Sequence, residues 1–85
     1  MFKGKKTNVP TMWRIYENGI PVATAENIQA AYYRMKAVIA EKASQNLKDY
    51  LLATLETSYA AQIQRGSKAD NLNSGTFHAK KVKAG

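Results

Sequence analysis

The sequence lacks several features that particular classes of protein require. It contains no cysteine, which excludes a disulfide framework and a thiolate metal site. It contains one histidine, His78, whereas a metal site needs three or four convergent ligands, so we expect no metal and no cofactor. No apolar run approaches the roughly 18 residues of a membrane-spanning helix, and no secretory signal is visible. We therefore expect a cytoplasmic protein, located in the host cytoplasm if it is viral, with no membrane contact.

Catalytic patterns are also missing. The acidic residues are scattered along the chain and balanced by basic neighbours, and nothing links Glu41 and Asp49 as an acid–base pair. The segment Gly66-Ser67-Lys68 lacks the Gly-x4-Gly-Lys frame of a phosphate-binding loop. The sequence therefore predicts a binding protein and not an enzyme.

The net charge of +7 is concentrated at the two ends of the chain. Residues 1–8 hold three lysines and no acid, and residues 65–85 hold five basic residues against Asp70. In residues 9–64, five basic and five acidic residues balance. Because residues 66–85 are rich in Gly, Ser and Asn, we expect them to bury too little apolar surface to offset their ordering entropy. The sequence thus predicts a basic flexible N-terminus at 1–8, a core domain at 9–65 and a flexible basic C-terminal tail at 66–85.

A β-hairpin is predicted at the start of the core. The pair Asn18-Gly19 favours a two-residue type I′ turn, and the residues on both sides of it are rich in β-formers. In this register Ile15 pairs with Val22. Four apolar side chains are then expected on the face toward the helices: Trp13, Ile15, Ile20 and Val22. The opposite face is expected to carry Arg14, Tyr16, Pro21 and Ala23.

Residues 25–64 contain neither glycine nor proline and show helical spacing of apolar residues. Thr24 is the expected N-cap, and Gly66 is expected to end the last helix. The apolar stripes of the two halves fall on opposite sides of one straight helix. Either the helix breaks near residues 43–46 into a helical hairpin, which we favour, or it continues and serves two separate cores. The predicted fold class is α+β, with a ββαα order and flexible basic ends.

The lysine-rich ends carry the functional hypothesis. We expect an oligomer whose ends contact nucleic acid or another polyanion without sequence specificity, because lysines neutralise phosphates and release counterions. The expected contacts are Lys3, Lys5, Lys6, Arg65, Lys68, Lys80, Lys81 and Lys83. Candidate interface residues are Arg14 and Tyr16 on the outer hairpin face and Tyr33 on the first helix.

An alternative function stays open. The chain is then a protein–protein interaction module, such as a small inhibitor or adaptor of viral or phage origin, that docks on a host protein or large assembly through the hairpin or an exposed helix face. A homo-oligomer is expected in either case, since a domain of this size buries only about 60% of its unfolded surface.

Overall fold

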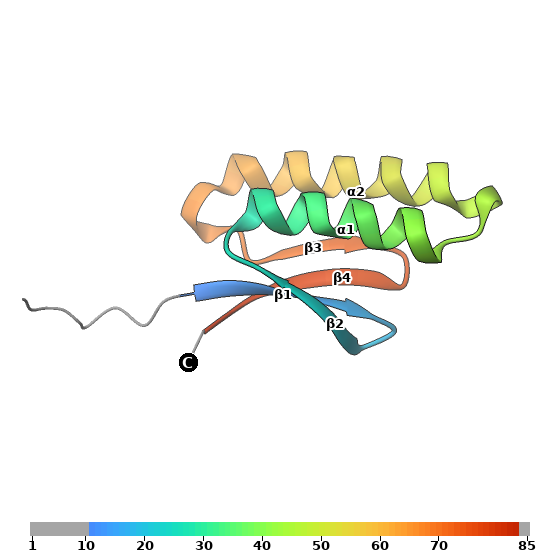
Figure 1. Cartoon of the computed structure of the whole chain (residues 1–85). Coiled ribbons are helices and arrows are strands. Elements are labelled where there is room, and N and C mark those ends of the chain that lie inside the picture. The colour runs from blue at the N-terminus through green and yellow to red at the C-terminus, as the bar shows by residue number, and fades with distance from the viewer. Residues whose placement is uncertain (1–10, 84–85) are drawn as a thin grey trace, which may run out of the picture.

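Two helices cover one face of a four-stranded antiparallel sheet in the computed structural model, which describes residues 11–83 (Figure 1). In chain order the elements are β1 (Thr11–Glu17), β2 (Ile20–Ala25), α1 (Ile28–Lys42), α2 (Gln45–Arg65), a 3-10 turn (Gly66–Lys68), β3 (Asn71–Ser74) and β4 (Phe77–Lys83). The strand order in the sheet is β2-β1-β4-β3. The α+β class is confirmed and the first four elements follow the predicted order, but the sheet has two more strands than the ββαα prediction contained.

The hairpin of β1 and β2 forms at the predicted turn. Asn18 and Gly19 both have positive φ, 53° and 80°, as a type I′ turn requires. Beyond the first two pairs an irregularity shifts the register, so that Ile15 lies opposite Ala23 instead of Val22. An extra residue in one strand reverses its alternation, which leaves Val22 exposed. Ile20, next to the turn, is 64% exposed, so the prediction that Ile20 and Val22 cover the helices is wrong.

The segment predicted as a flexible tail instead completes the sheet. Gly66 ends α2 as expected, and β3 and β4 then pair with each other, while β4 also pairs with β1. The composition of this segment is misleading because its few apolar residues alternate along the strands and reach the core, where Leu72, Phe77 and Ala79 are buried. β3 and β4 bury apolar surface of the core that we had expected a second copy of the chain to cover. The oligomeric state stays a prediction. The prediction for residues 1–8 lies outside the described residues.

The chain breaks between α1 and α2 at Ala43 and Ser44, which confirms the helical hairpin. The break lets the apolar stripes of both helices face the same sheet, where they bury Met35 and Ile39 of α1 with Leu55 of α2. No helix in residues 11–83 is long and apolar enough to cross a membrane.

The N-cap of α1 is Asn27, whose side-chain oxygen accepts a hydrogen bond from the Ala30 amide at 2.8 Å. Thr24, the predicted cap, belongs to β2, because that strand extends to Ala25. The helix therefore starts one turn later than predicted, and Thr24 is a residue of the sheet.

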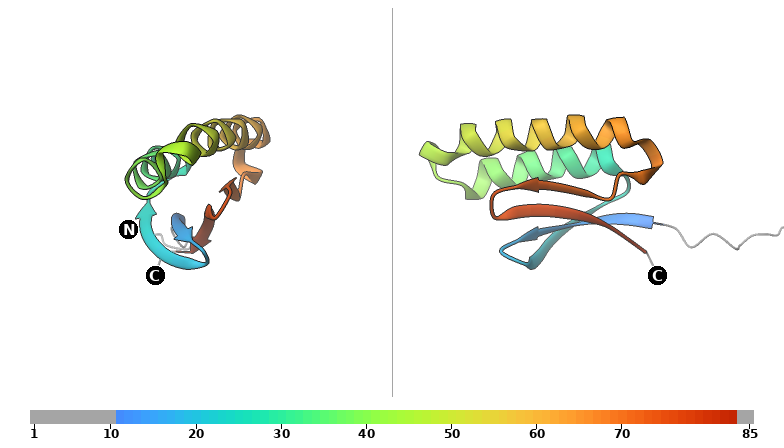
Figure 2. Two further views of the ribbon diagram at one scale, coloured as in Figure 1. Left: turned by 90° about the vertical axis from the view of Figure 1, so that its right-hand side faces the viewer. Right: turned by 180° about the vertical axis from the view of Figure 1, so that it is seen from behind.

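The outer edge of β3 is closed by side chains of α2. The backbone N–H of Asn73 donates to the Ser58 hydroxyl at 3.0 Å, and the backbone N–H of Asp70 donates to the Gln62 side-chain oxygen at 3.2 Å. The buried hydroxyl of Ser74 donates to a carbonyl of α2. Seen from the end and from behind, both helices lie on the same side of the sheet (Figure 2). Within residues 11–83 no helix covers the other face of the sheet.

Candidate functional site

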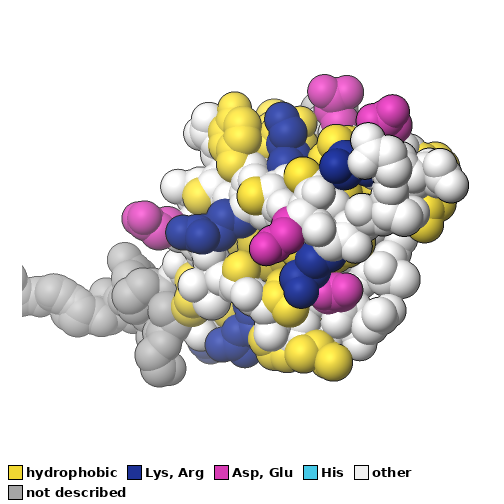
Figure 3. All heavy atoms as spheres, turned by 45° about the vertical axis from the view of Figure 1, so that its right-hand side comes forward, with side chains coloured by type: hydrophobic (Ala, Val, Ile, Leu, Met, Phe, Trp, Pro, Cys, Tyr) yellow, Lys and Arg dark blue, Asp and Glu magenta, His cyan; other side chains and the backbone are white. Residues whose placement is uncertain are grey.

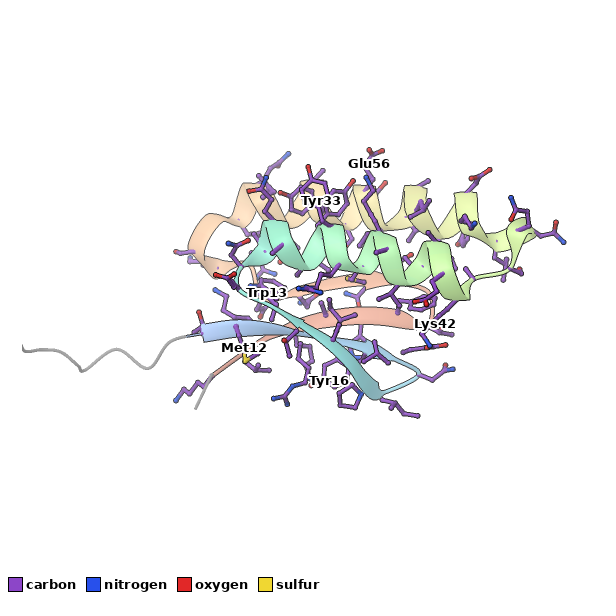
Figure 4. The ribbon with its side chains drawn as sticks, viewed as in Figure 1. Met12, Trp13, Tyr16, Tyr33, Lys42 and Glu56 are labelled. Carbon is purple, nitrogen blue, oxygen red and sulfur yellow. The ribbon has the colours of Figure 1, made fainter. Side chains whose placement is uncertain are left out.

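The open face is the side of the sheet that the helices leave uncovered. Because side chains alternate along a strand and directly paired residues share a face, the pairing defines which residues lie on it. They form three cross-strand rows: Pro21, Tyr16, His78 and Asn73; Thr24, Arg14, Lys80 and Asn71; and Met12 with Val82. Figure 4 shows Met12 and Tyr16 on the side of the sheet away from the helices, whereas Trp13 lies between the layers.

The first row is aromatic at its centre. The rings of Tyr16 and His78 lie in register on β1 and β4, with centroids 4.7 Å apart and planes 10° from parallel. A partly exposed stack of this kind offers a flat surface on which another π-system can pack.

The second row is basic at its centre. Arg14 on β1 lies directly opposite Lys80 on β4. Like charges at directly opposed positions destabilise a sheet, by roughly 0.2–1 kcal/mol on the scale of cross-strand pairs. No residue of the three rows is acidic.

Acids do adjoin the face. The Asp70 carboxylate accepts a hydrogen bond from the Asn71 side chain of the second row at 2.7 Å and lies 3.6 Å from Arg65. Glu17 follows Tyr16 in β1, and Glu26 lies near Met12 and Thr24.

The open face therefore unites residues that the sequence analysis had assigned to different parts of the molecule. Arg14 and Tyr16 were placed on an outer hairpin face and Lys80 in a flexible tail, and the pairing of β1 with β4 brings them side by side. His78 was missed, because a histidine in an assumed tail has no defined neighbours. The sequence did contain a signal for a strand here, because apolar and polar residues alternate in Phe77-His78-Ala79-Lys80.

The other predicted contacts of the C-terminal segment do not join this face. Lys81 pairs with Trp13 on the helix-covered side, and its ammonium group donates to the Ser67 carbonyl at 3.1 Å. Lys83 is exposed at the end of β4, and Lys68 is exposed in the 3-10 turn. Arg65 ends α2, where it is paired with Asp70. Lys3, Lys5 and Lys6 lie outside the described residues.

Tyr33, the third interface candidate, lies on the helix layer, on the opposite side of the molecule from Tyr16 (Figure 4). It is 57% exposed and packs near the Tyr32 ring, and the Lys36 ammonium group lies 5.5 Å from its ring centroid. Tyr32 in turn stacks on Tyr59 of α2. The structure therefore separates Tyr33 on the helix layer from the other two interface candidates on β1.

The rest of the described surface offers less defined chemistry. Figure 3 shows basic and acidic side chains interspersed on the face it presents. A hollow of about 470 Å³ lies where β1 and β2 meet α1, and Glu26 and Arg34 line it together with Met12 and Thr24 of the open face. Among residues 11–83 no three His, Asp or Glu side chains group in a way that would hold a metal ion.

Comparison with known proteins adds no assignment to this geometry. No family model, curated protein or solved structure matches the chain.

Proposed function

We propose that this protein binds nucleic acid without sequence specificity, using the open face of its sheet together with its lysine-rich ends. The observation that carries the proposal is the cross-strand pair of Arg14 and Lys80 on a face whose rows contain no acid. The pair opposes stable pairing of the strands, yet it creates a local positive potential that suits an anion.

The aromatic row supports nucleic acid over a simple polyanion. Proteins that bind nucleic acid without reading its sequence combine a positive surface with aromatic side chains on which bases stack. Tyr16 and His78 lie next to Arg14 and Lys80 on the same two strands. Phosphate contacts and base contacts are thus both available on one surface.

Salt dependence tests the proposal. Binding of a fluorescent 20-nucleotide strand, followed by anisotropy, is expected at about 50 mM salt and should weaken steeply by about 200 mM. The double variant R14Q/K80Q should bind more weakly and lower the slope of log K against log salt by up to about 1.4, at about 0.7 for each lost phosphate contact. Its stability should be unchanged or higher, because the variant removes a like-charge pair.

The matched control is K36Q/K48Q, which removes the same charge from the helices. Lys36 packs over the tyrosine rings of α1, and Lys48 lies in the first turns of α2. Equal losses in the two double variants would show that net charge and not the open face drives binding. Absence of any binding at about 50 mM salt would overturn the proposal.

The lysine-rich ends are tested by separate substitutions. Changing Lys3, Lys5 and Lys6 to glutamine should reduce affinity for all anionic probes by a similar factor, because such contacts carry no base information. The protein–protein module remains the alternative, and a chain that binds no nucleic acid would favour it.

A further inference from the structure

The stack of Tyr16 and His78 has a non-aromatic residue on each side. In the cross-strand row, Tyr16 has Pro21 on its other side, and His78 has Asn73 on its other side. Within residues 11–83 the aromatic ring stacked on His78 is that of Tyr16. The ring face of His78 toward β3 therefore adjoins an asparagine.

We propose that this face of His78 binds one unpaired base of a single strand, above Asn73. The inference rests on the proposed function and specifies its ligand as single-stranded nucleic acid. Since the two rings are only 10° from parallel, a planar base above Asn73 would continue the stack as a third layer.

Asn73 is the residue of β3 over which the stacked base would lie. Its side chain is short, and its amide nitrogen donates to the Asn71 side-chain oxygen at 2.7 Å. The Asn71 amide nitrogen donates in turn to the Asp70 carboxylate, also at 2.7 Å. These bonds tie the Asn73 side chain to its neighbour along β3.

The basic row lies where the backbone of the bound strand can follow. Arg14 lies two residues before Tyr16 on β1, and Lys80 lies two residues after His78 on β4. The two rows are therefore about 7 Å apart along the strands. A base on His78 therefore leaves its phosphates free to contact the basic row. Phosphate contacts set the position of the strand, and stacking holds the base.

A duplex fits this arrangement poorly. Its bases are already stacked on both sides, and its outer surface offers phosphates and groove edges, whereas a single strand can turn a base face outward. Stacking tolerates every base, so the site selects strandedness and not sequence.

The test compares strands with and without bases. The probes are fluorescein-labelled oligothymidylate, an abasic strand of equal length and charge, and a duplex of the same length. The native protein should bind oligothymidylate more tightly than the abasic strand. His78→Ala should weaken binding to oligothymidylate by about 5- to 150-fold and leave binding to the abasic strand unchanged.

Two variants serve as controls. His78→Phe keeps a ring for stacking and should preserve the preference for bases. Tyr50→Ala removes a tyrosine that is 66% exposed on α2, and it should change no affinity. Circular dichroism and thermal unfolding of each variant separate loss of the ring from loss of the fold.

The outcomes distinguish this inference from the proposed function. Equal affinity for oligothymidylate and the abasic strand would overturn the base site and leave salt-dependent binding through the basic row intact. Equal loss on both strands in His78→Ala would also overturn it, since His78 would then act through charge or structure. No binding to any probe would overturn both proposals.

Discussion

Gly75 lies in the turn between β3 and β4, where a single methyl group is expected to collide with the core. Its φ is +61°, a conformation that costs other residues about 1–3 kcal/mol. A Cβ at this position would also lie 2.7 Å from a terminal methyl carbon of Leu51, a residue of α2. Because Leu51 is only 7% exposed, its side chain has little room to move away. Forcing extra volume into a packed core typically costs about 1–3 kcal/mol more. We therefore expect Gly75→Ala to lower the free energy of unfolding by about 2–6 kcal/mol.

Gly66 provides the matched control. Its φ of +62° is nearly the same, but a Cβ there meets no atom within 4 Å. Gly66→Ala should therefore carry only the backbone cost, and the two variants should differ by about 1–3 kcal/mol. For a domain of this size that difference shifts the midpoint of thermal unfolding by at least about 4 °C, measured by calorimetry or circular dichroism.

The double variant Gly75→Ala/Leu51→Ala locates the cause. Leu51→Ala alone should cost about 2–5 kcal/mol, because it leaves a cavity under α2. In the Gly75→Ala background it should cost less, since the shorter side chain makes room for the added methyl group. If Gly75→Ala costs no more than Gly66→Ala, or if the two substitutions are additive, the packing of the β3–β4 turn against Leu51 is refuted.

Two further predictions test the corrected elements. Asn27→Ala should lower stability by about 0.5–2 kcal/mol through loss of the α1 cap, whereas Thr24→Ala should stay within about 0.5 kcal/mol; urea unfolding measures both, and equal costs would contradict the assignment of Asn27. Deletion of residues 69–85 should abolish cooperative thermal unfolding, because it removes both β3 and β4 with the buried residues Leu72, Phe77 and Ala79. If the truncated chain still unfolded cooperatively at the same midpoint temperature as the full chain, the C-terminal strands would be dispensable for the fold.

Local patterns in the sequence were sufficient for several elements. The Asn18-Gly19 turn follows from the two positive φ angles that only a few residue types adopt readily. The mismatch between the two apolar stripes favoured a helix break near Ser44 but left one continuous helix open, and the structure shows the break. Gly66 as the end of α2 follows from the same conformational freedom of glycine. The Asn18-Gly19 turn and the end of α2 depend on neighbouring residues, whereas the break depends on apolar spacing along residues 25–64.

Contacts between distant segments decided the rest. β4 inserts beside β1 across more than fifty residues of intervening sequence, and no local pattern in either strand names the other as its partner. The segment 66–85 is rich in Gly, Ser and Asn, yet it forms strands because its alternate apolar residues pack against the helices and β1.

The sequence by itself determined the charge, the first hairpin turn and the absence of cysteine chemistry, and it favoured two helices over one. Only the tertiary structure decided that Lys80 and His78 stand beside Arg14 and Tyr16 and that Lys81 does not. The physical reason is the pairing register: adjacent residues of a strand point to opposite faces, so the sheet separates neighbouring lysines and unites side chains from opposite ends of the chain.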